Sequence, residues 1–191
     1  GYDSGGPKGV NERLQAGWLP RDLMMILASG VEKVFVFRET GSGGNLFSAS
    51  GVIRDDGSLK PSWFTYATLI RQLNGVTDRP TKMRFDDSNI RAYLWNRGGK
   101  PVLTAWAIEK TAKLGLNLGP CTVTDAFGNA GSTDAGPALE LTEFPLYISD
   151  FTDPTAAARL ETQAKTMAEK QRQTEARHGR LRAYLYEFGT K

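Results

Sequence analysis

The sequence has little of the chemistry that several common classes of site require. Among its 191 residues, Cys121 is the only cysteine, which excludes an intrachain disulfide and a cysteine-based metal site. It stands in the strand-like segment CTVTDA, where we expect a small core hydrophobe. His178 is the only histidine, so a multi-histidine metal site is excluded, and its polar helical surroundings do not favour catalysis. We expect no metal and no cofactor.

Long apolar runs are also missing. No stretch is apolar over enough residues to cross a bilayer, so no membrane partner is expected. The first residues, GYDSGGPKGV, do not have the pattern of a signal peptide. Because the chain does not begin with methionine, we expect a processed, cleaved or trimmed product.

Charge of one sign is not in large excess. The formal net charge is +3, and acidic and basic residues are interspersed. The one local excess is eight Lys or Arg against five Asp or Glu over residues 151–191. A solvated helix face explains it best, and a nucleic-acid or membrane surface is the alternative. We predict no nucleic-acid partner.

Two amphipathic helices are predicted near the start of the chain. The first covers about residues 11–29, with Asn11 as its cap and Gly30 as its stop, and Pro20 should kink or split it. The second covers about residues 61–74 and begins with a proline, which suits a first helical turn. Its expected inner face comprises Trp63, Phe64, Ala67, Leu69, Ile70 and Leu73.

An apolar run, VFVF, lies between these helices and predicts a strand over residues 31–39. Such a run between helices is typical of a strand buried on both faces of a parallel sheet. A single strand would leave its backbone groups unpaired on both edges. Residues 1–76 therefore have the pattern of the tail of a larger α/β domain. The alternative is a local hairpin over residues 31–60, packed on the region that follows.

Residues 77–150 contain short segments rich in β-branched and aromatic side chains, punctuated by Gly, Pro and Asn. They predict a β-sandwich of six to eight strands between about 79 and 149, with a hairpin turn at NRGGKP. We expect Trp95 and Trp106 in core or interdomain packing rather than in carbohydrate stacking. The expected sandwich core includes Leu94, Leu103, Trp106, Leu116, Val123 and Leu139.

Residues 151–191 consist mainly of strong helix formers, and Asp153 with Pro154 is a start signal. The middle of this predicted helix has almost no apolar stripe. A stripe returns at its end, which should therefore dock against something. The stripe consists of Leu181, Tyr184, Leu185 and Phe188.

Taken in order, these segments resemble the end of the catalytic barrel in clan A glycoside hydrolases. There, a strand ending in TEFGY or similar carries the nucleophile Glu and is followed by a helix with a QA pair and an Arg. The last barrel strand follows, and then a GL…DG…KPA segment opens the last helix. The counterparts here are Gln15–Ala16, Arg21, Phe35 to Glu39, Gly51–Val52, Asp56–Gly57 and Lys60–Pro61. RAYLWNRGGKPVLTAWA and LELTEFPLYIS resemble strands of the accessory sandwich that often follows such barrels.

The resemblance covers about residues 1–150 and implies three parts. Residues 1–76 would be an α/β barrel fragment, the last strand and helices of a (β/α)8 (TIM) barrel. Residues 77–150 would be an all-β sandwich, followed by a C-terminal helix over 151–191. The implied activity is hydrolysis of O-glycosidic bonds by a retaining two-carboxylate mechanism. Both catalytic Glu residues would lie upstream of Gly1, so no catalytic residue is assigned in this chain.

The resemblance also implies which residues would form the wall of a substrate cleft. Tyr2 would hydrogen-bond a sugar or the nucleophile, or is an exposed end residue. Arg38 and Glu39 would face substrate from the end of the strand, or pair with each other or with loop groups. Phe47 would stack on a sugar or hold its loop in place. The nearby TGSGGN matches neither standard glycine fingerprint for phosphate.

The implied partners are a carbohydrate substrate and an N-terminal barrel portion, or a partner chain, that covers the 31–39 strand. The implied location is secreted or periplasmic. Two other functions stay open. One is a non-catalytic carbohydrate- or protein-binding β-sandwich module with a vestigial enzyme tail. The other is a basic helical adaptor that contacts nucleic acid.

Overall fold

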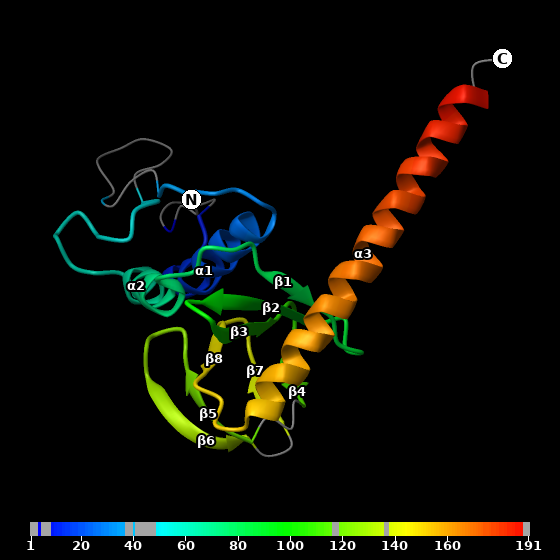
Figure 1. Ribbon diagram of the computed structural model, residues 1–191. Coiled ribbons are helices and arrows are strands. Elements are labelled where there is room, and N and C mark those ends of the chain that lie inside the picture. Colours follow the sequence, from blue (N-terminus) through cyan, green and yellow to red (C-terminus); the bar gives the residue numbers. More distant parts are fainter. Residues whose placement is uncertain are drawn as a thin grey trace.

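The computed structural model describes Ser4, residues 9–36, Thr40, and residues 49–115, 119–135 and 138–188. These form a mostly antiparallel β-sheet with few helices, a β-sandwich-like arrangement. Figure 1 shows two short helices together on one side of the sheet and a long third helix extending away from it. The elements are α1 (Glu12–Ala28), α2 (Pro61–Leu73), β1 (Thr81–Met83), β2 (Ile90–Arg97), β3 (Lys100–Ala107), β4 (Ala112–Leu114), β5 (Gly119–Thr124), β6 (Ala130–Ala135), β7 (Leu139–Leu141), β8 (Leu146–Ser149) and α3 (Pro154–Phe188).

The first two helices begin and end close to where the sequence predicts. The Asn11 side chain accepts a hydrogen bond from the Leu14 backbone N–H at 2.8 Å, which caps α1. Helix α2 begins with Pro61, whose missing N–H costs nothing at that position. Pro20 is buried inside α1, which continues through it as one element, so of the two expected effects, a kink or a split, the split does not occur.

The predicted strand over residues 31–39 is wrong for residues 31–36, which have no regular secondary structure, and residues 37–39 lie outside the described part. Phe35, in the middle of the apolar run, is 84% exposed. The described residues offer this segment no neighbouring strand, and an unpaired strand has no hydrogen-bond ladder to stabilise it. The described residues do not show the alternative hairpin for residues 31–36 either: the bridges in this region join Thr40 to Ile53 in parallel and Ile53 to Leu59 in antiparallel orientation.

Six strands form one sheet in the order β1-β2-β3-β8-β5-β6, and every pairing in it is antiparallel. β2 and β3 pair over their whole length as a hairpin. Its turn residues, Gly98 and Gly99, have φ angles of 57° and 85°. Two positive φ angles are what a tight hairpin turn between twisted strands requires, and this confirms the turn predicted at NRGGKP. β4 and β7 form a separate two-stranded sheet.

The large sheet is covered on both faces, so it separates two hydrophobic clusters. On one face, Leu103 and Ile148 pack with Leu141 of the small sheet and with Leu160 of α3. On the other face the sheet packs against α1 and α2. That second cluster includes Leu23, Met24, Leu69, Tyr93, Trp95, Val102, Trp106 and Tyr147. Alternate residues of β2, β3 and β8 belong to opposite clusters, as the two-residue period of a strand requires.

The expected sandwich core is confirmed for part of its members. Leu94 and Leu103 are buried in the first cluster, and Val123 and Leu139 pack against it while partly exposed. Trp106 is buried, but it faces the helices rather than the sandwich interior. Leu116 lies outside the described residues.

Trp95 and Trp106 pack in the cluster between the helices and the sheet, which agrees with the expected core or interdomain packing. Trp95 donates a hydrogen bond from its indole N–H to Thr104 at 2.9 Å. The Arg21 guanidinium lies 5.8 Å from the centre of the Trp106 ring. Tyr147 is buried in the same cluster, where desolvation raises its pKa, and its hydroxyl has no hydrogen-bond partner within the described part of the chain.

Helix α3 begins at Pro154, next to Asp153, whose carboxylate accepts a hydrogen bond from the Thr155 backbone N–H at 2.8 Å. Leu160 and Ala164 anchor its first turns on the sheet, and its later part extends away from the body (Figure 1). Within the described residues, no helix combines the length and apolar character that crossing a membrane requires.

Candidate functional site

The four residues that the sequence marks for substrate binding lie outside the described part of the chain. These are Tyr2, Arg38, Glu39 and Phe47. The candidate site is therefore built from the described residues that follow or precede them in the chain. Ser4 lies near Tyr2 in the segment before α1, and Ala49 lies near Phe47 in the segment before α2. Both take part in a polar network at the starts of α1 and α2, which also includes Glu12, Gln15, Arg54, Lys60 and Ser62.

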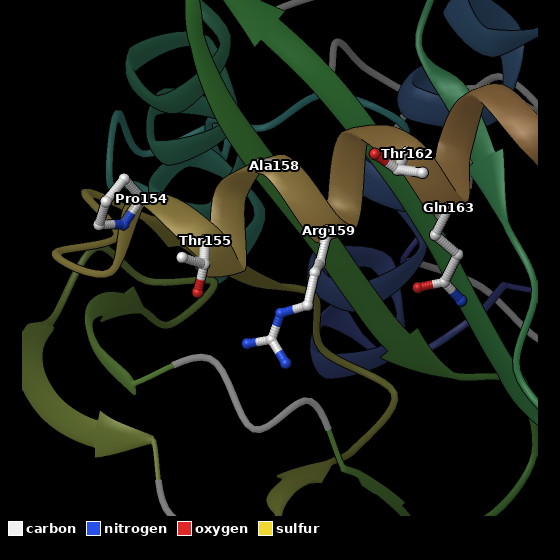
Figure 2. A pocket seen from close by; sticks show the side chains of 6 residues that line it. All are labelled: Pro154, Thr155, Ala158, Arg159, Thr162 and Gln163. Atoms are coloured by element: carbon white, nitrogen blue, oxygen red, sulfur yellow. The ribbon is translucent and has the colours of Figure 1, made fainter.

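One cavity among the described residues offers little chemistry. It has a volume of about 620 Å³ and lies along the first turns of α3, where it is lined by Pro154, Thr155, Ala158, Arg159, Thr162 and Gln163. Figure 2 shows the Arg159 side chain extending away from the helix. Arg159 is the one charged residue in this lining, and its guanidinium lies 3.9 Å from the Asp153 carboxylate. We assign no function to this cavity.

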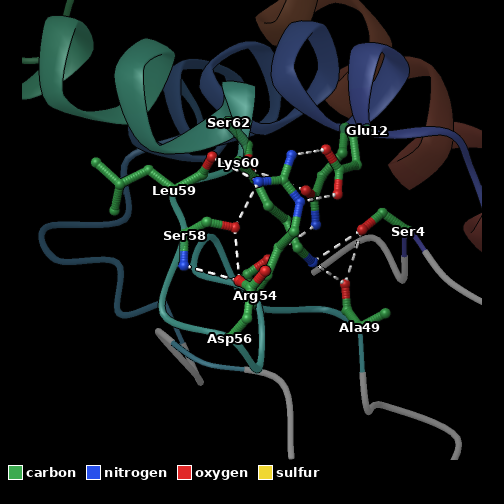
Figure 3. Close-up of polar contacts among 11 residues, drawn as sticks. Ser4, Glu12, Ala49, Arg54, Asp56, Ser58, Leu59, Lys60 and Ser62 are labelled. Atoms are coloured by element: carbon green, nitrogen blue, oxygen red, sulfur yellow. Dashed lines mark hydrogen bonds and ion pairs between the residues drawn. The ribbon is translucent and has the colours of Figure 1, made fainter.

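Arg54 and Glu12 form the most specific contact of the polar network (Figure 3). Two guanidinium nitrogens of Arg54 donate to the two carboxylate oxygens of Glu12, at 2.8 and 2.5 Å. This two-point contact fixes the plane of both groups, which a single hydrogen bond does not. The hydrogen bond from Arg54 lowers the pKa of Glu12. The pair ties the loop before α2 to the first turn of α1.

Lys60 is the buried cation of the network. Its residue is only 3% exposed, and its ammonium donates to the Ser4 hydroxyl at 2.9 Å and to the Ala49 carbonyl at 2.7 Å. The Ser4 hydroxyl and backbone N–H both donate to that same carbonyl. A buried ammonium is stable only where acceptors replace its water. Lys60 therefore joins the loop before α1 to the loop before α2.

Gln15 connects the two helices directly. Its amide oxygen accepts from the Ser62 hydroxyl at 2.9 Å, and its amide nitrogen donates to the Gly51 carbonyl at 3.3 Å. Gln15 and Ser62 are both buried. The starts of α1 and α2 thus lie together. Their ends also lie together, because Leu27 and Leu73 line one cavity of about 210 Å³. The two helices run in the same direction.

A pocket of about 380 Å³ opens beside this network. It is lined by Ser4, Glu12, Ala49, Ile53, Arg54, Asp55, Asp56 and Lys60. Hydrogen bonds from Ser58 lower the pKa of Asp56, so both Asp56 and Glu12 are held in the ionised form. A general acid in hydrolysis needs a raised pKa instead. These two carboxylates suit structural roles or contacts to hydroxyl groups rather than acid catalysis.

The sequence identified several of these residues without predicting their contacts. Gln15, Asp56 and Lys60 are among the positions that correspond to clan A motifs, whereas Glu12 and Arg54 are not. The signal for their pairing was weak, because they lie 42 residues apart in chain order. Within the described residues, no group of three His, Cys, Asp or Glu side chains could hold a metal ion.

Comparison with known proteins identifies one similar fold. No family model matches the chain, and no curated protein matches it. A solved structure of a family 39 glycoside hydrolase from the gut symbiont Bacteroides cellulosilyticus WH2 is similar, with a TM-score of 0.58 and 19% sequence identity. The similarity covers 78% of this chain and 32% of that chain. The chain thus matches about a third of the length of that enzyme, and the likeness is one of fold.

Proposed function

We propose that this chain is the C-terminal part of a glycoside hydrolase that cleaves O-glycosidic bonds by a retaining two-carboxylate mechanism. The observation that carries the proposal is the fold similarity to a family 39 glycoside hydrolase over 78% of this chain. The order of the motifs in residues 1–150 supports the same relation independently of the structure. Fold alone does not determine activity, so the proposal also depends on the site.

The direction of α1 and α2 supports a barrel origin for residues 1–76. In a (β/α)8 barrel, successive helices run parallel, and each helix begins at the end of the barrel where the active site lies. Here both helices run in the same direction, and their starts share the network of Lys60, Gln15 and Glu12. The pocket beside this network would then belong to the rim of the catalytic face.

The catalytic carboxylates are proposed to lie upstream of Gly1. A retaining mechanism needs a nucleophile and an acid/base, about 5–5.5 Å apart, on the ends of different barrel strands. Glu12 pairs with Arg54, and Asp56 is held by a turn, so neither is placed for that work. This chain would contribute one wall of the cleft, with Tyr2, Arg38, Glu39 and Phe47 in contact with the sugar.

Large apolar side chains left exposed between residues 26 and 70 support the presence of a covering partner. Phe64 and Ile70 of α2 are 48% and 54% exposed, and Phe35 is exposed between the helices. Large exposed apolar side chains of this kind are what an interface with a covering partner would bury. The remaining barrel portion would cover them and provide residues 31–39 with neighbouring strands.

Activity measurements test this proposal. Purified residues 1–191 should not hydrolyse a panel of aryl glycosides, because loss of a catalytic carboxylate lowers turnover by orders of magnitude. Adding the polypeptide that completes the barrel should restore turnover. Hydrolysis by residues 1–191 alone, surviving dilution and repurification, would show that the active site is misplaced. Sugar binding without turnover, even with the barrel completed, would support a non-catalytic module instead.

A further inference from the structure

Three cations lie together at the edge of the large sheet and are called the basic edge: Lys82, Arg84 and Arg91. Lys82 lies in β1, which is the outermost strand, and it pairs with Tyr93 of β2. Arg84 directly follows β1, and Arg91 lies one residue before Ala92, the partner of Met83. Continuing this register places Arg84 opposite Arg91.

All three side chains belong to the same face of the sheet. Tyr93, opposite Lys82, packs in the cluster shared with α1 and α2, whereas Met83 and Ala92 pack in the cluster shared with α3. Because successive side chains of a strand point to opposite faces, Lys82, Arg84 and Arg91 stand on the α1 and α2 face. Lys82 and Arg84 are exposed and Arg91 is half-buried, so the basic edge is an open surface.

The cations of the basic edge form no ion pair with a described carboxylate. None of the four ion pairs among the described residues involves Lys82, Arg84 or Arg91. Burial and the charges of Arg91 and Arg84 lower the pKa of Lys82, and no carboxylate acts against them. Like charges on adjacent strands destabilise a sheet unless a ligand or counter-ion compensates them. An anionic group is the ligand that relieves this repulsion.

The geometry favours a chain of anionic groups over one small ion. Two residues along a strand are about 7 Å apart, and residues opposite each other on neighbouring strands are about 5 Å apart. The cations are therefore spread over a surface rather than directed at one point in a cavity. Guanidinium groups bind planar oxyanions such as carboxylates through two hydrogen bonds, and two of the three cations are arginines.

We propose that the basic edge binds a glycan that carries carboxylate or sulfate groups, at a surface separate from the pocket beside Lys60. The choice of carbohydrate over another polyanion rests on the proposed glycosidase function. The binding of an anionic ligand is inferred from the positive charge of Lys82, Arg84 and Arg91 and from their register in the sheet. Such a surface would hold a substrate chain near the enzyme while the cleft acts on it.

Binding of residues 1–191 to polygalacturonate and to dextran sulfate tests the proposal, with neutral dextran as the reference. The variant K82A/R84A/R91A should bind either polyanion about tenfold more weakly, since each exposed charge contact contributes a fraction of a tenfold change. The matched variant K165A/K170A/R177A removes three exposed cations from α3 and should change affinity less than about twofold by the same reasoning. Binding should weaken as ionic strength rises. Circular dichroism of both variants checks that they fold.

Three outcomes would overturn the proposal. They are equal losses in the two variants, binding of neutral dextran as strong as that of the polyanions, and tighter binding of duplex DNA than of either glycan. The measurement uses no catalytic activity. Failure of glycan binding would therefore contradict the basic edge proposal without contradicting the proposed glycosidase function, which the activity measurement tests. Absence of turnover would likewise not affect the basic edge proposal, which the binding measurement tests.

Discussion

The sheet region and the helical region before it differ in how completely they bury their apolar side chains. In the sheet region, strands alternate between two clusters, and both clusters are closed by other elements of the same chain. In the region before it, large apolar side chains remain at the surface. Of the seven large hydrophobic residues exposed in the described part of the chain, six lie between Ile26 and Ile70 and only Phe127 lies in the sheet region.

This difference is the one that the proposed covering portion would produce: the described sheet region buries its apolar side chains within the chain, and the helical region leaves several exposed. The sheet pairs its own strands, and α1 and α2 close one of its faces. These helices carry apolar residues on a second side, where nothing among the described residues covers them. Substitutions that compare the two regions test this interpretation.

The largest expected effect is in the sheet region. Trp106→Ala should lower the free energy of unfolding by about 3–5 kcal/mol, because it leaves a cavity between the sheet and α1. Phe35→Ala is the control, and its effect should stay within about 0.5 kcal/mol because the side chain is exposed. Urea unfolding measures both. Comparable losses in the two variants would mean that the regions do not differ as described.

A smaller effect is expected at the network that joins the two helices. Lys60→Met should cost about 1–3 kcal/mol, because the Ser4 hydroxyl and the Ala49 carbonyl lose their buried partner. The control is Lys100→Met at the exposed hairpin turn, where we expect almost no change. Thermal or urea unfolding distinguishes them. Equal stability of the two variants would show that water replaces the Lys60 ammonium without cost.

The Glu12–Arg54 pair should make a modest contribution that depends on pH. Because the folded-state pKa of Glu12 is lowered from 4.5, its stabilisation is present above that value and is lost as pH falls through the folded-state pKa. Glu12→Gln should therefore reduce stability at neutral pH and have progressively less effect in acid. Unfolding curves across that range check the trend, with the exposed Glu32→Gln as control. A constant difference between Glu12→Gln and the unmodified protein would contradict it.

The smallest effect on stability should come from the exposed side of α2. The double substitution of Phe64→Ser and Ile70→Ser should change the free energy of unfolding by no more than about 1 kcal/mol, since both side chains are half-exposed. Its effect should instead be on association, because it removes apolar surface. Sedimentation velocity should show less self-association than in Phe127→Ser, which changes the one large apolar side chain exposed in the described sheet region. Unchanged association would remove the support for a covering partner.

The sequence predicted correctly those features of the fold that depend on neighbouring residues in the chain. The cap at Asn11, the proline at the start of α2 and the paired glycines of the β2–β3 hairpin act within a few residues of themselves. Each was recognisable because its cause lies in the same stretch of sequence. The alternating segments after residue 79 likewise predicted a sandwich of antiparallel strands.

The remaining features depend on contacts between distant residues. The run at residues 31–36 has the composition of a strand, but a strand also needs neighbouring strands to pair with, and these do not follow from the composition of the run. Phe64 and Ile70 were expected on the inner face of α2, yet that helix turns Leu69 toward the sheet and leaves them exposed. The Ser4–Lys60 contact spans 56 residues and has no periodic signature. Sequence motifs marked Lys60 but not what it binds.

The placement of the tryptophans has a spectroscopic consequence. Trp63, Trp95 and Trp106, three of the four in the chain, belong to the cluster between the helices and the sheet. No tryptophan lies in the cluster on the opposite face, where Leu141 and Leu160 pack. Intrinsic tryptophan fluorescence should therefore change when α1 and α2 separate from the sheet and should change little when α3 does. Two optical transitions that fail to coincide would then locate which face of the sheet opens first.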